Sequence, residues 1–147
     1  GIVTGMVAGL GTITPASGFV GPLGALVIGV SAGLVCFMAT NYMKRSLHVD
    51  DSLDVFPVHG VGGILGTTLT GVFAATTLGG VGFAEGMTMG KQVMTQITGV
   101  LVTAVWSGAV SYLLLKLIDA MVGLRVSIEH ETEGLDTVLH NETGYNL

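Results

Sequence analysis

The chain has 147 residues, half of them hydrophobic and only 10% charged, with a formal net charge of -5. A soluble globular domain carries roughly a quarter charged residues, so this composition excludes an ordinary soluble domain and predicts a lipid environment. The acidic balance excludes a nucleic-acid-binding protein, because phosphate backbones need a basic surface, and the single cysteine excludes a disulfide framework within one chain.

Four apolar segments are predicted to be transmembrane helices. They cover about residues 1–14, 21–43, 51–78 and 93–122, and a polar, acidic tail covers residues 123–147. The first segment is shorter than the roughly 20 residues that a span needs, and it starts without Met or a charged leader region. We therefore expect an all-α, polytopic membrane helix bundle that is the C-terminal part of a longer protein.

The basic residues orient these helices. Lys44 and Arg45 follow the second segment, while Lys116 and Arg125 flank the end of the fourth. Basic residues are enriched in cytoplasmic loops. The loop at 44–50 and the tail are therefore predicted to be cytoplasmic. The two assignments agree, because the two predicted helices between them return the chain to the same side of the membrane.

Glycines recur at helical spacing in three ridges, where small side chains let helix backbones approach closely in a membrane. The ridges are Gly1, Gly5 and Gly9; Gly29 and Gly33; and Gly62 and Gly66. They predict close helix packing and no bound cofactor. The single cysteine, Cys36, lies in an apolar segment and is predicted to pack in the core.

The stretch DDSLDVFPVHGVGG, residues 50–63, brings carboxylates directly before an apolar helix. Asp50, Asp51 or Ser52 can cap the helix, where a negative charge also meets the positive end of the helix dipole. Asp54 lies about one turn further on. Two interpretations of Asp54 remain open, because it can hold neighbouring backbone amides or attract a cation.

His59 is the candidate functional residue of this stretch. It is predicted to lie roughly 12 Å beyond Asp51, inside a membrane core about 30 Å thick. A histidine inside a membrane span usually serves a function, and a neutral imidazole offers one donor and one acceptor. Val55 shares its helix face, and the nearby glycines 62, 63 and 66 predict a narrow slot beside it. No second ligand lies at i+3 or i+4, so no metal site is predicted.

These residues resemble the ammonium transporter family (Amt/Mep/Rh), in its bacterial and archaeal Amt branch. The resemblance is carried by HVDDSLDVFPVHGVGGILGTTLTGVFA, with further matches in AGLGTITPASGFVGPLGALVIG and GLRVSIEHETEGLD. It implies a homotrimer of eleven-helix subunits in the inner (plasma) membrane, each subunit with its own pore for ammonium or ammonia. The four predicted helices would be the last four, followed by a cytoplasmic regulatory tail.

The resemblance also implies roles for individual residues. His59 matches the second of two pore histidines that share a hydrogen bond, Val55 a pore-lining apolar position, and Thr14 a polar position near the conduction path. Asp54 matches an aspartate at the inner end of the helix. Together with Asp51 it is expected to be structural or to attract the cation.

The tail is similar to a regulatory C-terminus that binds a PII-type protein. The positions expected to bind that partner are Gly123, Leu124, Arg125, Val126, Gly134, Leu135 and Asp136. Apolar tail residues favour partial docking over a free linker. One departure is Pro57, where the family often has glycine, and it is expected to alter the local helix geometry.

Ammonium transport is therefore the predicted function. An ammonium sensor or scaffold that signals through the tail is the alternative. An enzyme is not expected, because Asp54 lies on a different helix face from His59 and offers no second catalytic group beside it.

Overall fold

In this computed structural model, which describes residues 1–144, every regular element is a helix. The predicted all-α fold is confirmed, while residues 145–147 of the predicted tail lie outside the described residues. The chain divides into two compact units, Gly1–Ala104 and Val105–Leu147.

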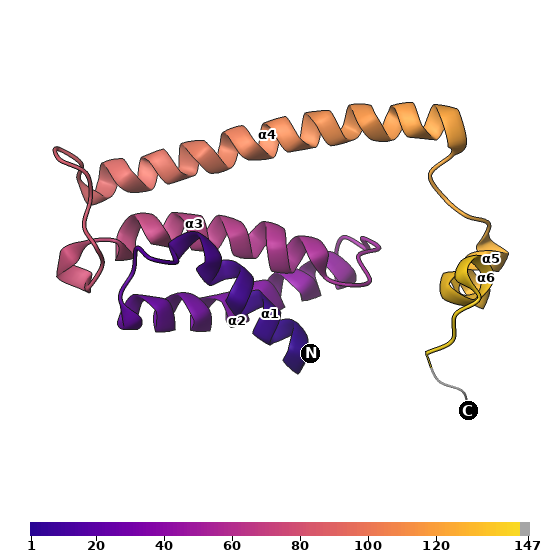
Figure 1. Cartoon of the computed structure of the whole chain (residues 1–147), viewed down its shortest axis with the longest axis horizontal. Helices are drawn as coiled ribbons and strands as arrows, with labels where there is room; N and C mark the ends of the chain where they lie inside the picture. Colours follow the sequence, from indigo (N-terminus) through magenta and orange to yellow (C-terminus); the bar gives the residue numbers. More distant parts are fainter. Residues whose placement is uncertain (145–147) are drawn as a thin grey trace. The chain divides into compact units, whose positions relative to one another are not determined.

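The first unit is built on three packed helical segments. Figure 1 shows the helices α1, α2 and α3 side by side, and each of them contacts the other two. The elements in chain order are α1 (Ile2–Ile13), the 3₁₀ turn η1 (Thr14–Ala16), α2 (Pro22–Arg45), the π-helical turn η2 (Phe56–Val61), α3 (Gly62–Phe73) and the 3₁₀ turn η3 (Thr76–Leu78).

Proline and glycine set several of these boundaries. Pro15 stands in η1, where the α-helical hydrogen bonding of α1 stops. Gly21 is extended at the N-cap of α2 and Pro22 follows in its first turn, a position where its missing N–H has no helical partner to lose. Gly79 ends η3 in a left-handed conformation, with φ +83°, which glycine adopts without steric cost.

The third apolar segment is not the continuous helix predicted over residues 51–78. Asp54 has φ +56°, a left-handed conformation that interrupts a right-handed helix. Helical structure begins after it, with η2 running directly into α3 and ending at Phe73. The turn η2 contains Pro57, and its π-type bond joins the Gly62 N–H to the Pro57 carbonyl. A π turn of this kind adds one residue to a helical turn.

Small residues form the core between α1, α2 and η2. Ala8, Cys36 and Val58, one from each element, make a buried cluster, so the predicted core position of Cys36 is confirmed. The Gly62–Gly66 ridge packs on α1, where a Cβ at either glycine would contact Thr12. Close approach through small residues is the usual packing mode of membrane helices.

The other two glycine ridges have no such partner among the described residues. A Cβ built at Gly1, Gly5, Gly9, Gly29 or Gly33 would meet nothing within 4 Å. The prediction of close packing therefore holds for one ridge of three in this chain.

The helix α4 (Met89–Val122) begins about one turn before the predicted segment 93–122 and has no buried residue. Its 34 residues reach about 51 Å at 1.5 Å per residue. By length and composition α2 and α4 can each cross a membrane, whereas α1 is shorter. Two short helices, α5 (Ile128–Glu133) and α6 (Leu135–His140), follow in the tail.

Candidate functional site

Asp51 holds the start of the helical segment that carries His59. Its carboxylate accepts the backbone N–H groups of Val55 at 2.9 Å and of Phe56 at 2.8 Å. These hydrogen bonds, that from Phe56 first, lower the pKa of Asp51 because they stabilise the ionised form. Of the three residues predicted as possible caps, Asp51 is the one that binds these amides.

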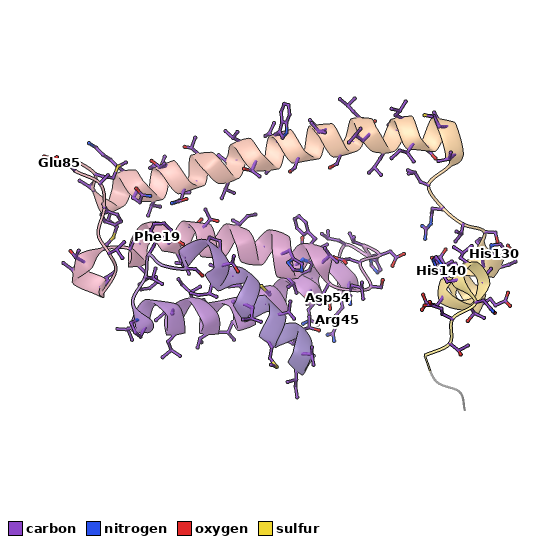
Figure 2. All side chains as sticks on the ribbon, in the orientation of Figure 1. Phe19, Arg45, Asp54, Glu85, His130 and His140 are labelled. Atoms are coloured by element: carbon purple, nitrogen blue, oxygen red, sulfur yellow. The ribbon has the colours of Figure 1, made fainter. Side chains whose placement is uncertain are left out.

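Asp54 has a partner that neither interpretation drawn from the sequence named, and its expected role at the pore stays a prediction. Its carboxylate forms an ion pair with Lys44, with Nζ and Oδ1 2.6 Å apart. The Asp54 side chain is largely buried, at 17% exposed, and that of Lys44 is 42% exposed. Lys44 is in the last turn of α2, so the pair joins the end of α2 to the turn before η2. Figure 2 shows Asp54 and Arg45 at one end of the packed helices and Phe19 at the other.

His59 lies in a shallow, mainly apolar groove. The groove is lined by Met43, Val49, Asp51, Val55, Phe56, His59 and Gly60. The structure therefore brings together His59, Val55 and Asp51 of the predicted residues. An imidazole in its neutral form presents one hydrogen-bond donor and one acceptor to a molecule in this groove.

The predicted slot of glycines beside His59 is wrong in its residues. Gly62 and Gly66 are buried against Thr12 of α1, and the glycine that lines the groove is Gly60. The expected slot required an ideal α-helix through the whole segment. The π turn η2 changes the register between His59 and the residues after it, so the later glycines face α1.

Gly11 is a neighbour of His59 that belongs to none of the predicted glycine ridges. A Cβ at Gly11 would lie 3.9 Å from Nδ1 of His59 and 3.9 Å from the Val58 carbonyl oxygen. A glycine here lets α1 approach the backbone of η2. No pattern in the sequence marks Gly11, because it stands outside the four-residue spacing of Gly1, Gly5 and Gly9.

Thr14 is not brought into the groove. It lies in η1, exposed, and its hydroxyl donates to the Leu10 carbonyl at 2.7 Å. Asp54 also lies outside the groove and lines a separate cavity of about 350 Å³, with walls that include Ala8 of α1 and Cys36 of α2.

The tail residues predicted to bind a partner lie around the two short helices. Ser127 caps α5 by accepting the His130 N–H at 3.3 Å, and Arg125 pairs with Glu131 at 2.9 Å. Glu129, in the first turn, has a lowered pKa, because its carboxylate accepts its own backbone N–H and a hydrogen bond from Ser127.

The remaining predicted tail positions are turn residues and exposed side chains. Gly123 and Gly134 have φ +78° and +102°, conformations that favour glycine. Leu124 is 47% exposed and Leu135 is 40% exposed, whereas Val126 is half-buried. Asp136 lies in the first turn of α6, where its charge suits the helix dipole.

Comparisons with known proteins cover nearly all of this chain. The sequence pattern of the Ammonium Transporter Family matches residues 1–145. An ammonium transporter of Aquifex aeolicus is 46% identical over all of this chain and 34% of its own length. The ammonium transporter Amt1 of Archaeoglobus fulgidus is 40% identical over 99% of this chain and 37% of its own length.

A solved structure named Sensor Amt Protein also resembles the chain. It superimposes with a TM-score of 0.82 at 32% identity, over 92% of this chain and 33% of that structure. The chain therefore spans about a third of the length of the relatives that it matches.

Proposed function

Because the chain belongs to the ammonium transporter family, a family of multi-pass membrane transporters and not of enzymes, we propose that the whole protein carries ammonium nitrogen across a membrane. His59 and Val55 are the residues of this chain that line the path. The observation that supports this role is the apolar groove in which both side chains lie.

The chemistry of the groove explains why an imidazole is useful there. Moving NH4+ from water into an apolar, low-dielectric site costs on the order of 20 kcal/mol in the idealised limit, whereas neutral NH3 loses only hydrogen bonds. A path that admits the nitrogen after deprotonation therefore excludes K+, which has no proton to lose. His59 offers NH3 a hydrogen bond within a groove lined mainly by apolar side chains.

Asp51 supports the site in two ways. It fixes the first amides of the His59 segment through its carboxylate, and it places a negative charge in the lining of the same groove. A carboxylate that stays ionised attracts a cation to the polar end of the groove. We assign the first histidine of the proposed pair to the part of the family fold outside this chain.

Uptake of radiolabelled methylammonium by the whole protein, in cells that lack other ammonium transport, tests the proposal. His59→Asn is expected to reduce uptake at least tenfold at equal amounts of protein in the membrane. His48→Asn is the matched control, because His48 lies in the 44–50 loop with φ +52°, which asparagine also adopts. Equal uptake by the two variants, with K+ still excluded, contradicts the role of His59.

We extend the same proposal to the membrane, the assembly and the partner of the transporter. We place the whole protein in the inner membrane as a homotrimer, with the tail on the cytoplasmic side and a PII-type protein as its partner. Exposed apolar side chains on both short helices, Ile128 at 77% and Leu139 at 53%, support docking of the tail. The basic Lys44 and Arg45 support the orientation.

An ammonium sensor is the second candidate. It is favoured by the similarity to the structure named Sensor Amt Protein. A sensor that does not transport would bind methylammonium without accumulating it in cells, and substitutions in the tail would abolish its signal while leaving binding unchanged. Uptake by the wild-type protein decides between the two candidates.

A further inference from the structure

The Lys44–Asp54 ion pair joins the end of α2 to the segment that carries His59, and it does so outside the groove. Lys44 stands in the last turn of α2. Asp54 stands immediately before Val55, which begins the segment that carries His59. Neither residue lines the groove of His59, so neither contacts a molecule that lies in it. Their 2.6 Å pair can act on the groove only through the backbone.

The backbone at Asp54 makes this connection a rigid one. Its φ of +56° is uncommon for a residue other than glycine. The turn is closed from both sides: the Asp54 N–H donates to the Asp51 carbonyl at 3.2 Å, and the Asp54 carbonyl accepts from the Val58 N–H at 3.0 Å. An Asp54 side chain held by Lys44 therefore fixes the direction in which η2 leaves the loop.

We propose that Lys44 is a positioning residue for His59, acting through its ion pair with Asp54. The inference rests on the proposed transport function. Asp51 sets the first amides of the segment, and the Lys44–Asp54 pair sets where that turn stands relative to α2. His59 follows Asp54 by five residues and lies within the π turn η2. A displacement of the turn is thus passed on to the imidazole.

Because Asp54 is largely buried, Lys44→Met is expected to disturb the site more than Asp54→Asn does. Its side chain is 17% exposed, and removing one partner of a mostly buried pair leaves an uncompensated charge. Lys44→Met does this, whereas Asp54→Asn removes the buried charge itself. Asparagine also accepts the left-handed conformation, so Asp54→Asn keeps the turn. The double variant removes both charges, and it is expected to perform better than Lys44→Met alone.

The experiment measures methylammonium uptake by the whole protein, normalised to protein in the membrane. Lys44→Met is expected to lower the maximal rate five- to twentyfold and to leave the apparent KM within twofold, because Lys44 does not contact the groove. Lys44→Met/Asp54→Asn recovers to the rate of Asp54→Asn, and Lys44→Arg keeps at least half of the wild-type rate. Arg45→Met, which removes a neighbouring charge of the same helix turn, is the matched control and stays near wild type.

A second measurement follows His59 directly, independently of transport. In the purified protein, diethyl pyrocarbonate modification of His59 is quantified by mass spectrometry, with His130 of the tail as the internal reference. Lys44→Met is expected to change the modification rate at least threefold, and the double variant to restore it. The proposal is overturned if both the rate of uptake and the rate of modification in Lys44→Met match wild type, or if the two substitutions add independently. If the wild-type protein shows no uptake, the proposed transport function is refuted. The modification rates of His59 then still test whether Lys44 positions it.

Discussion

Gly66 offers a direct test of how the helical segment of His59 is packed. A Cβ at Gly66 would lie 2.9 Å from the carbonyl carbon of Thr12 and against its carbonyl oxygen. Because these are backbone atoms of α1, no side-chain rotation relieves the clash, and α1 or α3 must shift. Overpacking of this kind costs typically about 1–3 kcal/mol, and we place Gly66→Ala at the upper end. Alanine gains about 1 kcal/mol over glycine in a helix, so the expected net destabilisation is about 2 kcal/mol.

Gly62 contacts the same residue in a different way, and this difference makes the test specific. A Cβ at Gly62 would lie 2.7 Å from Oγ1 of Thr12 and 3.3 Å from Sγ of Cys36. These atoms belong to side chains, which can move by a few tenths of an ångström. Thr12→Ala removes Oγ1 and is therefore expected to rescue Gly62→Ala. It leaves the Thr12 carbonyl in place, so it does not rescue Gly66→Ala.

Equilibrium unfolding with SDS in mixed micelles, followed by circular dichroism, measures these free energies. Each double variant is compared with Thr12→Ala alone, since that substitution has its own effect. Gly63→Ala is the control, because a Cβ there meets no described residue within 4 Å; it is expected to be neutral or up to about 1 kcal/mol more stable. Equal stability of Gly66→Ala and Gly63→Ala would refute the packing argument, as would rescue of Gly66→Ala by Thr12→Ala.

Two further predictions concern the turn before His59. Pro57 is fully buried in η2. Pro57→Ala is expected to destabilise the protein by about 1–2 kcal/mol, because it raises the conformational entropy of the unfolded chain and removes packed atoms. Unfolding in SDS measures this loss, and an unchanged midpoint contradicts the prediction. Asp51 has a pKa below its ordinary value, which is about 3.9. The contribution of its carboxylate to the free energy of unfolding is therefore present above that ordinary value. It is lost as the pH falls through the lowered pKa of the folded protein. The stability difference between wild type and Asp51→Asn should therefore be constant from about pH 5 to 7 and shrink below pH 4, and a difference that does not change with pH contradicts the prediction.

Much of the helical organisation could be predicted because it rests on composition and local signals. The apolar runs located α2 and α4 to within about a turn at most ends. The Gly62–Gly66 spacing predicted a packed ridge, which the contacts with Thr12 confirm. Cys36 was correctly assigned to the core, because a free cysteine in an apolar helix packs as a small hydrophobic residue.

The errors concern features that no short-range pattern encodes. The left-handed Asp54 and the π turn at Pro57 broke a helix that periodicity alone extended over residues 51–78. The partner of Asp54 was missed because Lys44 is ten residues earlier and was counted only as a topological charge. Thr14 donates its hydroxyl to the Leu10 carbonyl, and its expected position near the path stays a prediction.

The packing prediction and the proposed function meet at two consecutive residues of α1. Thr12 carries the backbone on which Gly66 packs, and Gly11 directly before it approaches Nδ1 of His59. If alanine at position 66 pushes α1 away, it also moves Gly11, so the wall beside the imidazole changes together with stability. Gly66→Ala should therefore reduce methylammonium uptake per folded molecule, whereas Gly62→Ala rescued by Thr12→Ala should restore both stability and uptake. If the Gly66→Ala protein is destabilised yet transports at the wild-type rate per folded molecule, the packing of α1 does not control the position of His59, and this prediction is wrong.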